Sequence, residues 1–332
     1  MRASGELVAI CEDDLLRPHI LTTGDGRDWE ATEPSGLIGS DPTHRPILTA
    51  LTEGPDGGLL VVGADATEDI SSGDAAVWMS RDASAWTRVP LSRTLQDAEM
   101  TDVAPTDSGF IAVGGDGFPG GNVQLPGLRG PVAWQSADGS AWDLTPVPRP
   151  SERMLMEGIT AVSGGWLSWG GGAPPGTGAV WTSRDGEAWA FAGTPSGDPW
   201  GPIGKVIAAP DGSLIAVGSA WRGGDEDTLA GIWRSADGGS HWDRIDVVTA
   251  GGPGALWDIL WTGDRFVATG AQGRILQSAN GTDWSAEPPD PFNPGVTMRR
   301  LILMGDVLIG FGSEDSPNGT TARIWIRSAR PS

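Results

Sequence analysis

The stretch SRDGEAW, residues 183–189, decides the fold, because close variants of it recur along the chain. Each variant has Ser or Thr, then Asp or Asn two positions later, then a Trp. The paired residues are Asp25 and Trp29, Asp82 and Trp86, Asp138 and Trp142, Asp185 and Trp189, Asp237 and Trp242, and Asn280 and Trp284. Successive Trp residues are 57, 56, 47, 53 and 42 positions apart. Repeats of this length with β-type turns are typical of β-propeller blades.

Each of these boxes has a local structural explanation. The Asp accepts backbone N–H groups in a tight turn, and the Gly that often follows it adopts a positive φ. The Trp begins the next strand and buries its ring against the hairpin. We therefore expect the box residues to be structural and not catalytic.

A second motif precedes each box and occurs seven times as a short buried strand, such as LLVVG (59–63) or LIAVG (214–218). A third element, such as AVWMS or GIWRS, leads into the box. Together they predict an all-β fold, a seven-bladed β-propeller of four-stranded antiparallel blades with the boxes between strands 3 and 4; six or eight blades are the alternatives. The predicted single domain 1–332 has blades at about 1–42, 43–96, 97–150, 151–198, 199–250, 251–294 and 295–332. The first blade lacks strand 1, and the last ends before its box.

The loops divide into two kinds. The turns between strands 1 and 2 are all short, whereas the loops between strands 2 and 3 are long and dissimilar, as in GGDGFPGGNVQLPGLRGP (114–131). Variable loops on a rigid scaffold commonly carry function. The face formed by the 2–3 and 4–1 loops is therefore the expected functional face.

Three Trp residues lie outside the repeated motifs and map to that face of blades five and six. The candidate ligand-binding residues are Trp200, Trp221, Arg222, Asp225, Trp257 and Asp258. Flat aromatic rings beside charged side chains are suited to stacking a sugar or holding a peptide. The alternative is that the rings only cap the apolar ends of neighbouring blades.

Acidic residues recur after the second strand of several blades: Glu12, Asp13, Asp14, Asp65, Asp116, Glu314 and Asp315. Such carboxylates are ligands for a hard cation such as Ca²⁺, although solvated loop acids are the commoner explanation. The three His residues show no zinc-binding spacing. We expect no catalytic residue among the repeats, no resident metal and no cofactor.

Charge and composition exclude several classes of partner. The net charge of −21 opposes binding to nucleic acid or to an anionic membrane. No apolar run is long enough to span a bilayer, and the first residues do not read as a signal peptide. The single Cys11 permits no intrachain disulfide. We expect a monomer without membrane insertion.

The boxes make the chain resemble the Asp-box, or bacterial neuraminidase repeat, propellers over nearly its whole length. Members include sialidases, xyloglucan-cleaving glucanases, sortilin receptors and photosystem II assembly factors. The resemblance implies an extracytoplasmic or secreted location in a bacterium. Sialidases of this family use a Tyr nucleophile and an Arg-Ile-Pro motif; this sequence contains no Tyr and no such motif. Sialidase-type catalysis is therefore not expected.

The leading functional prediction is a non-catalytic propeller that binds a protein or a carbohydrate on the loop face. The alternative is a glycoside hydrolase that uses two loop carboxylates drawn from Asp225, Asp227 and Asp258. A third hypothesis is that the chain is a structural module of a larger envelope protein.

Overall fold

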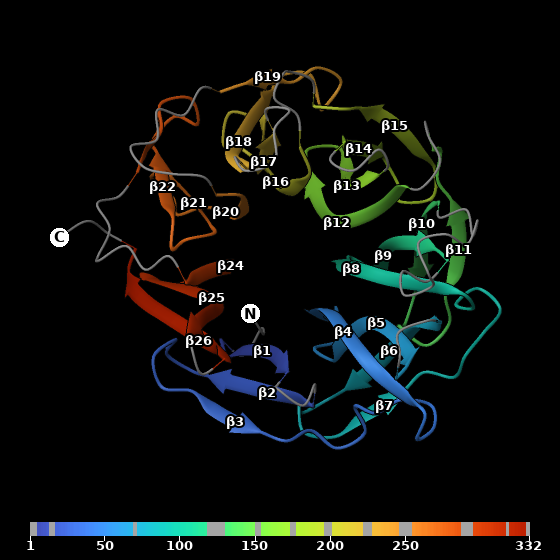
Figure 1. Ribbon diagram of the computed structural model, residues 1–332. Coiled ribbons are helices and arrows are strands. Elements are labelled where there is room, and N and C mark those ends of the chain that lie inside the picture. The colour runs from blue at the N-terminus through green and yellow to red at the C-terminus, as the bar shows by residue number, and fades with distance from the viewer. Residues whose placement is uncertain are drawn as a thin grey trace. The chain divides into compact units, whose positions relative to one another are not determined.

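The computed structural model describes residues 5–12, 17–68, 72–117, 130–149, 154–172, 177–195, 201–221, 228–245, 254–286, 295–316 and 319–329. All the regular elements in these ranges are β-strands (Figure 1). Within the same ranges, no helix is long and apolar enough to cross a membrane.

The strands form seven sheets in which consecutive strands are hydrogen-bonded neighbours. In chain order the sheets are β1 (Leu7–Glu12), β2 (Pro18–Thr23) and β3 (Glu30–Thr32); β4 (His44–Glu53), β5 (Leu59–Thr67), β6 (Gly73–Ser80) and β7 (Trp86–Arg88); β8 (Ala98–Thr106), β9 (Gly109–Asp116), β10 (Pro131–Ser136) and β11 (Asp143–Pro146); β12 (Met154–Val162), β13 (Gly165–Gly172), β14 (Thr177–Ser183) and β15 (Trp189–Gly193); β16 (Ile203–Ala208), β17 (Leu214–Trp221), β18 (Thr228–Ser235) and β19 (Asp243–Arg244); β20 (Leu256–Trp261), β21 (Phe266–Gly270), β22 (Ile275–Ser278) and β23 (Ser285–Ala286); and β24 (Val296–Met304), β25 (Val307–Ser316) and β26 (Gly319–Ser328).

The predicted fold class is confirmed: the chain is an all-β, seven-bladed β-propeller whose boxes connect the third and fourth strands of the blades. Within the described residues, the five middle sheets have four strands each, and the first and last have three. Because β1 carries the second-strand motif, the described part of the first sheet has no counterpart of a first strand.

The chain divides into two compact units. One comprises Met1–Ser168 with Thr182–Phe191, and the other comprises Trp169–Trp181 with Ala192–Ser332. The single domain over 1–332 therefore stays a prediction, and each unit is described by itself below.

The core of each unit lies between neighbouring sheets. In the first unit, one apolar cluster joins Val62 and Val77 of the second sheet to Met100 and Trp134 of the third. In the second unit, a corresponding cluster joins the sheets that begin with β16 and β20. The second strands are buried on both sides, and this explains why they are runs of apolar residues without alternation.

The boxes are held by hydrogen bonds within a few residues of the chain. In the box of β14–β15, the hydroxyl of Ser183 accepts the N–H of Gly186 at 2.8 Å, and Oδ1 of Asp185 accepts two further N–H groups at 2.8 and 2.9 Å. The indole N–H of Trp189 donates to the carbonyl of Gly186 at 2.9 Å. Such backbone N–H donors hold the pKa of Asp82 in the equivalent box down to about 2.

The box glycine also makes a contact between blades. Gly186 has a φ of 80°, and a Cβ placed on it would lie 2.3 Å from Cδ1 of Ile111 in the preceding sheet. The same relation holds for Gly139, whose Cβ would lie 2.6 Å from Cδ1 of Leu60. The boxes therefore join neighbouring blades as well as closing their own hairpins.

A β-bulge recurs in the first strand of the blades. In β8 the register shifts between Met100 and Asp102, so that Thr101 is the extra residue. Four other first strands shift at the same place: β4, β16, β20 and β24. The carbonyl just before the bulge faces the glycine that ends the second-strand motif; a Cβ on Gly114 would lie 2.0 Å from the carbonyl oxygen of Glu99. In the first sheet, Cys11 takes the place of the glycine that ends the second-strand motif. The described residues place no first strand beside it.

Candidate active site

Two glutamates on neighbouring first strands of the first unit form the candidate active site. Glu99 lies near the start of β8, and Glu157 lies on β12. Glu157 follows Met156 as Thr101 follows Met100, so by sequence it matches the bulged residue of β8. Bulges redirect side chains and are common beside active sites.

Hydrogen bonds fix β8 and β12 relative to each other. The hydroxyl of Thr101 donates to the carbonyl of Met156 at 2.6 Å. One carboxylate oxygen of Asp102 accepts the N–H of Val103 at 2.9 Å, and the other accepts the N–H of Ile159 on β12 at 3.0 Å. Glu99 and Glu157 are therefore carried by strands whose relative position is set by bonds on either side of Glu157.

The environment of Glu157 raises the pKa of its carboxyl group from 4.5 to about 7. Loss of solvation is the larger cause, and the charge of Glu99 is the second. The side chain of Glu157 is nevertheless open to solvent. A carboxyl group that is closely surrounded by protein and still accessible meets the needs of a residue that exchanges a proton with a substrate.

The pair has the chemistry of a general acid beside a second carboxyl group. A carboxyl group with a pKa near 7 is half protonated near neutral pH, which suits it to donate a proton to a leaving group. A carboxyl group with a raised pKa close to a second carboxyl group is typical of acid–base pairs in hydrolases.

The raised pKa has a consequence for stability. A carboxyl group whose pKa is higher in the folded chain stabilises the fold below its ordinary pKa of 4.5, and this contribution is lost as the pH rises through about 7. The glutamine of Glu157→Gln stays neutral at every pH. We therefore expect the melting temperature of this variant to exceed that of the parent chain by more at pH 8 than at pH 5. Scanning calorimetry at the two pH values measures the difference. Glu187→Gln, on an exposed box turn, is the control and should show no such change with pH. If the melting temperatures of Glu157→Gln and the parent chain differed by the same amount at both pH values, the raised pKa of Glu157 would be contradicted.

The predicted ligand-binding residues are only partly described. Trp200, Arg222 and Asp225 lie outside the described residues, as does Asp227. Trp221 ends β17, and its side chain is not described. Their predicted role as a ligand site stays a prediction.

The two remaining candidates lie side by side on β20. Trp257 is the bulged residue of this strand, and the guanidinium of Arg299 lies 5.3 Å from the centre of its ring. Asp258 is fully buried, and its oxygens accept the N–H groups of Ile259 at 2.8 Å and of Leu301 at 2.6 Å. Nζ of Lys205 lies 2.6 Å from the same carboxylate. Asp258 thus repeats in the second unit the bond between first strands that Asp102 makes in the first.

The acids that follow the second strands have local partners. Asp65 is buried and accepts the N–H of Ser40 at 3.1 Å and a guanidinium N–H of Arg88 at 2.8 Å. Glu314 pairs with Arg323 at 2.8 Å, and Asp315 accepts the hydroxyl of Thr320 at 2.7 Å. Asp13 and Asp14 are not described. Among the described residues, no group of three His, Cys, Asp or Glu side chains is placed to hold a metal ion.

The sequence patterns did not single out Glu99 or Glu157. The carboxyl groups predicted for a hydrolase were assigned to loops of blades five and six, whereas both glutamates lie inside strands of the third and fourth blades. A signal was present in MLMEGITAV (154–162), where one acidic residue interrupts an otherwise apolar strand. A charge in such a strand calls for a partner or a function.

Comparisons with known proteins support the fold. No protein-family model matches the sequence, and no curated protein matches it. Among solved structures, the GH93 α-L-arabinofuranosidase of Fusarium graminearum in complex with arabinobiose is similar, with a TM-score of 0.57, 14% identity, and coverage of 98% of this chain and 90% of that one. An α-L-arabinanase of Penicillium chrysogenum complexed with arabinobiose gives a TM-score of 0.54, 14% identity, and coverage of 86% and 98%. The Hadza microbial sialidase Hz136 gives a TM-score of 0.52, 15% identity, and coverage of 88% and 65%.

These likenesses place the fold of the chain among the sialidase-like β-propellers, as its Asp boxes predict. They also correct the leading functional prediction. A non-catalytic binding scaffold was expected, but the similar structures include several glycoside hydrolases. The prediction of a scaffold rested on the loops of blades five and six, and it gave no role to the first strands that carry Glu99 and Glu157. The hydrolase alternative is the better supported of the two.

Proposed function

We propose that this chain is a glycoside hydrolase in which Glu157 is the general acid and Glu99 is the second carboxyl group. The observation that carries the proposal is the placement of the two glutamates on strands that are bonded to each other, where desolvation and the charge of Glu99 raise the pKa of Glu157 to about 7. Glycoside hydrolases commonly need two carboxyl groups, one of which is protonated at the working pH. The fold likeness to glycoside hydrolases supports the proposal independently of the two residues.

In the proposed reaction, the protonated carboxyl of Glu157 donates its proton to the glycosidic oxygen as the bond to the anomeric carbon breaks. The carboxylate of Glu99 either activates a water molecule or attacks the anomeric carbon itself. The two outcomes correspond to carboxyl separations in the complex of about 6.5–9.5 Å and about 5–5.5 Å, respectively. The anomer that appears first in an NMR time course distinguishes inversion from retention.

The substrate class that we propose is an arabinose-containing oligosaccharide. Its support is that two similar structures are described with arabinobiose bound. Because this chain is only 14% identical to each of these proteins, the proposal does not extend to the linkage or the length of the oligosaccharide.

A panel of oligosaccharides and aryl glycosides tests the proposal, with arabinobiose and linear arabino-oligosaccharides as its first members. We expect the unmodified chain to release reducing sugar from at least one arabinoside, and Glu99→Gln and Glu157→Gln to lose the release while remaining folded. Glu187→Gln is the matched control and should retain it. Release from another sugar only would correct the substrate class. Absence of release across the panel, or equal release by both site variants, would overturn the proposed reaction.

A further inference from the structure

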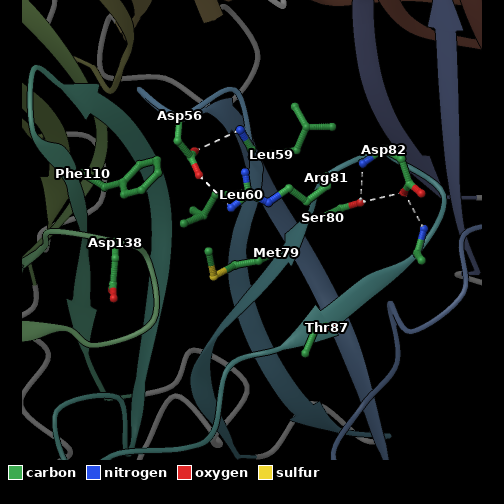
Figure 2. Close-up of a pocket in the computed structure, with 12 residues that line it drawn as sticks. Asp56, Leu59, Leu60, Met79, Ser80, Arg81, Asp82, Thr87, Phe110 and Asp138 are labelled. Atoms are coloured by element: carbon green, nitrogen blue, oxygen red, sulfur yellow. Dashed lines mark hydrogen bonds and ion pairs between the residues drawn. The ribbon is translucent and has the colours of Figure 1, made fainter.

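A pocket of about 370 Å³ lies between the second and third sheets, at the end that carries their boxes (Figure 2). Its apolar wall is made by Leu60, Met79 and Phe110, and its polar rim includes Asp56 and Asp138. The pocket is lined by the turn between β4 and β5 and by two boxes, and neither Glu99 nor Glu157 lines it. It is therefore a separate feature from the proposed active site.

The same place between two sheets of the second unit is filled by Arg234 of β18. Its Nε donates to the hydroxyl of Ser213 at 3.0 Å, and its Nη1 donates to the carbonyl of Asn280, in the box of the next blade, at 3.3 Å. Its Nη2 pairs with the carboxylate of Asp211, in the turn between the first two strands. One guanidinium thus joins a turn carboxylate to the carbonyl of a neighbouring box.

Between the third and fourth blades, a shorter side chain makes part of this connection. Gln135 of β10 occupies the register of Arg234, directly before the serine that opens the box. Its amide N–H donates to the carbonyl of Asp185, in the box of the next blade, at 3.4 Å. A donor at this register therefore bridges to the following box in both units.

Between the second and third blades, the residue at this register is Met79, which has no donor. The other parts of the arrangement are present. Asp56 matches Asp211, and its Oδ1 accepts the N–H of Gly58 at 3.0 Å, as Oδ1 of Asp211 accepts that of Ser213 at 3.0 Å. Asp138 matches Asn280 in the next box. Figure 2 shows the thioether of Met79 directed from its strand towards the box loop that carries Asp138. The pocket therefore has the same surroundings as Arg234, but it has no guanidinium at that register.

The charges around the pocket favour a cation. Backbone N–H donors hold the pKa of Asp82 at about 2 and lower that of Asp138, so these two carboxylates of the pocket lining are ionised at neutral pH. Arg81 pairs with Asp56 at 3.1 Å, but its side chain is 81% exposed. Exposed pairs of this kind contribute little and are readily replaced.

We propose that this pocket binds the guanidinium group of an arginine side chain presented by a peptide partner. The guanidinium pairs with Asp56 and donates to the carbonyl of Asp138, as Arg234 does with Asp211 and Asn280. The methylene stem packs on Leu60, Met79 and Phe110. A planar group with several donors suits this arrangement better than an ammonium, because a carboxylate and a carbonyl accept from it at once.

Titration calorimetry with Nα-acetyl-arginine amide tests the proposal, with the citrulline analogue as the uncharged probe of the same shape. We expect binding to the unmodified chain, and binding at least about tenfold weaker for the citrulline analogue. Met79→Arg supplies an internal guanidinium and should weaken binding of the arginine probe at least about tenfold, whereas Met79→Leu should preserve it. Asp56→Asn gives a second test of the same site and should also weaken binding.

Arg234→Met provides the converse test, because it should create a second arginine site in the other unit. Doubling of the stoichiometry in this variant would support the proposal. Three results would overturn it: no binding of the arginine probe, equal binding of the citrulline analogue, or undiminished binding by both Met79→Arg and Asp56→Asn.

Discussion

Glu157→Gln should lower kcat/KM for glycosides with poor leaving groups by about 10²- to 10⁴-fold, the usual contribution of a general acid. The side chain keeps its shape and loses only the proton that the leaving group needs. A substrate whose leaving group departs without protonation, such as a dinitrophenyl glycoside, should lose much less. The ratio of the two effects in steady-state kinetics separates proton donation from simple loss of binding.

Glu99→Gln is the matched variant for this experiment. Glu99 acts on the anomeric carbon or on water, so its replacement should slow both kinds of substrate alike. Equal losses for both substrates in Glu157→Gln would contradict its assignment as the acid. A much larger loss for the poor leaving group in Glu99→Gln would mean that the two roles are exchanged.

Asp258→Asn should lower the free energy of unfolding by about 1–3 kcal/mol, as expected when a buried hydrogen-bonding group is left unsatisfied. The carboxylate accepts the N–H groups of Ile259 and Leu301 and pairs with Lys205. An amide directs its own NH₂ group at one of these donors and leaves the lysine without its partner charge. Urea denaturation, monitored by Trp fluorescence, measures the effect.

Asp102→Asn is the control, because Asp102 makes the corresponding bonds to Val103 and Ile159 but is only half-buried, whereas Asp258 is fully buried. Its cost should be smaller than that of Asp258→Asn. If Asp258→Asn instead left stability unchanged and abolished binding of a sugar or peptide, the structural account of Asp258 would be wrong and its predicted ligand-binding role would gain support.

The fold was predictable because its decisive interactions are local. In each box a hydroxyl, a carboxylate or amide oxygen and an indole bond to backbone groups within a few residues, so the pattern is legible in a short stretch such as 183–189. The three strands that the structure describes in the first and in the last sheet also agree with the motif order, in which the first unit begins with the second-strand motif and the last ends before its box.

The candidate site was not predictable in the same way. Glu99 and Glu157 lie on different blades, and their interaction depends on how β8 and β12 are aligned by Thr101 and Asp102. The β-bulge that follows Glu99 in β8 leaves no local sequence pattern, although the glycine facing it does recur at the end of the second-strand motif. The variable sequences of the loops favoured the loops as the functional region, and several of the loop residues predicted to bind a ligand lie outside the described ranges.

The pH dependence of kcat/KM on a cleaved arabinoside tests the central claim most directly, because it reports the ionisation of the acid in the free enzyme. The pKa of about 7 for Glu157 predicts a rate that falls as the pH rises through about 7, since the acid loses its proton there. A rate that stays constant from about pH 5 to 9, or one that rises through this range, would contradict the assignment of Glu157 as the general acid.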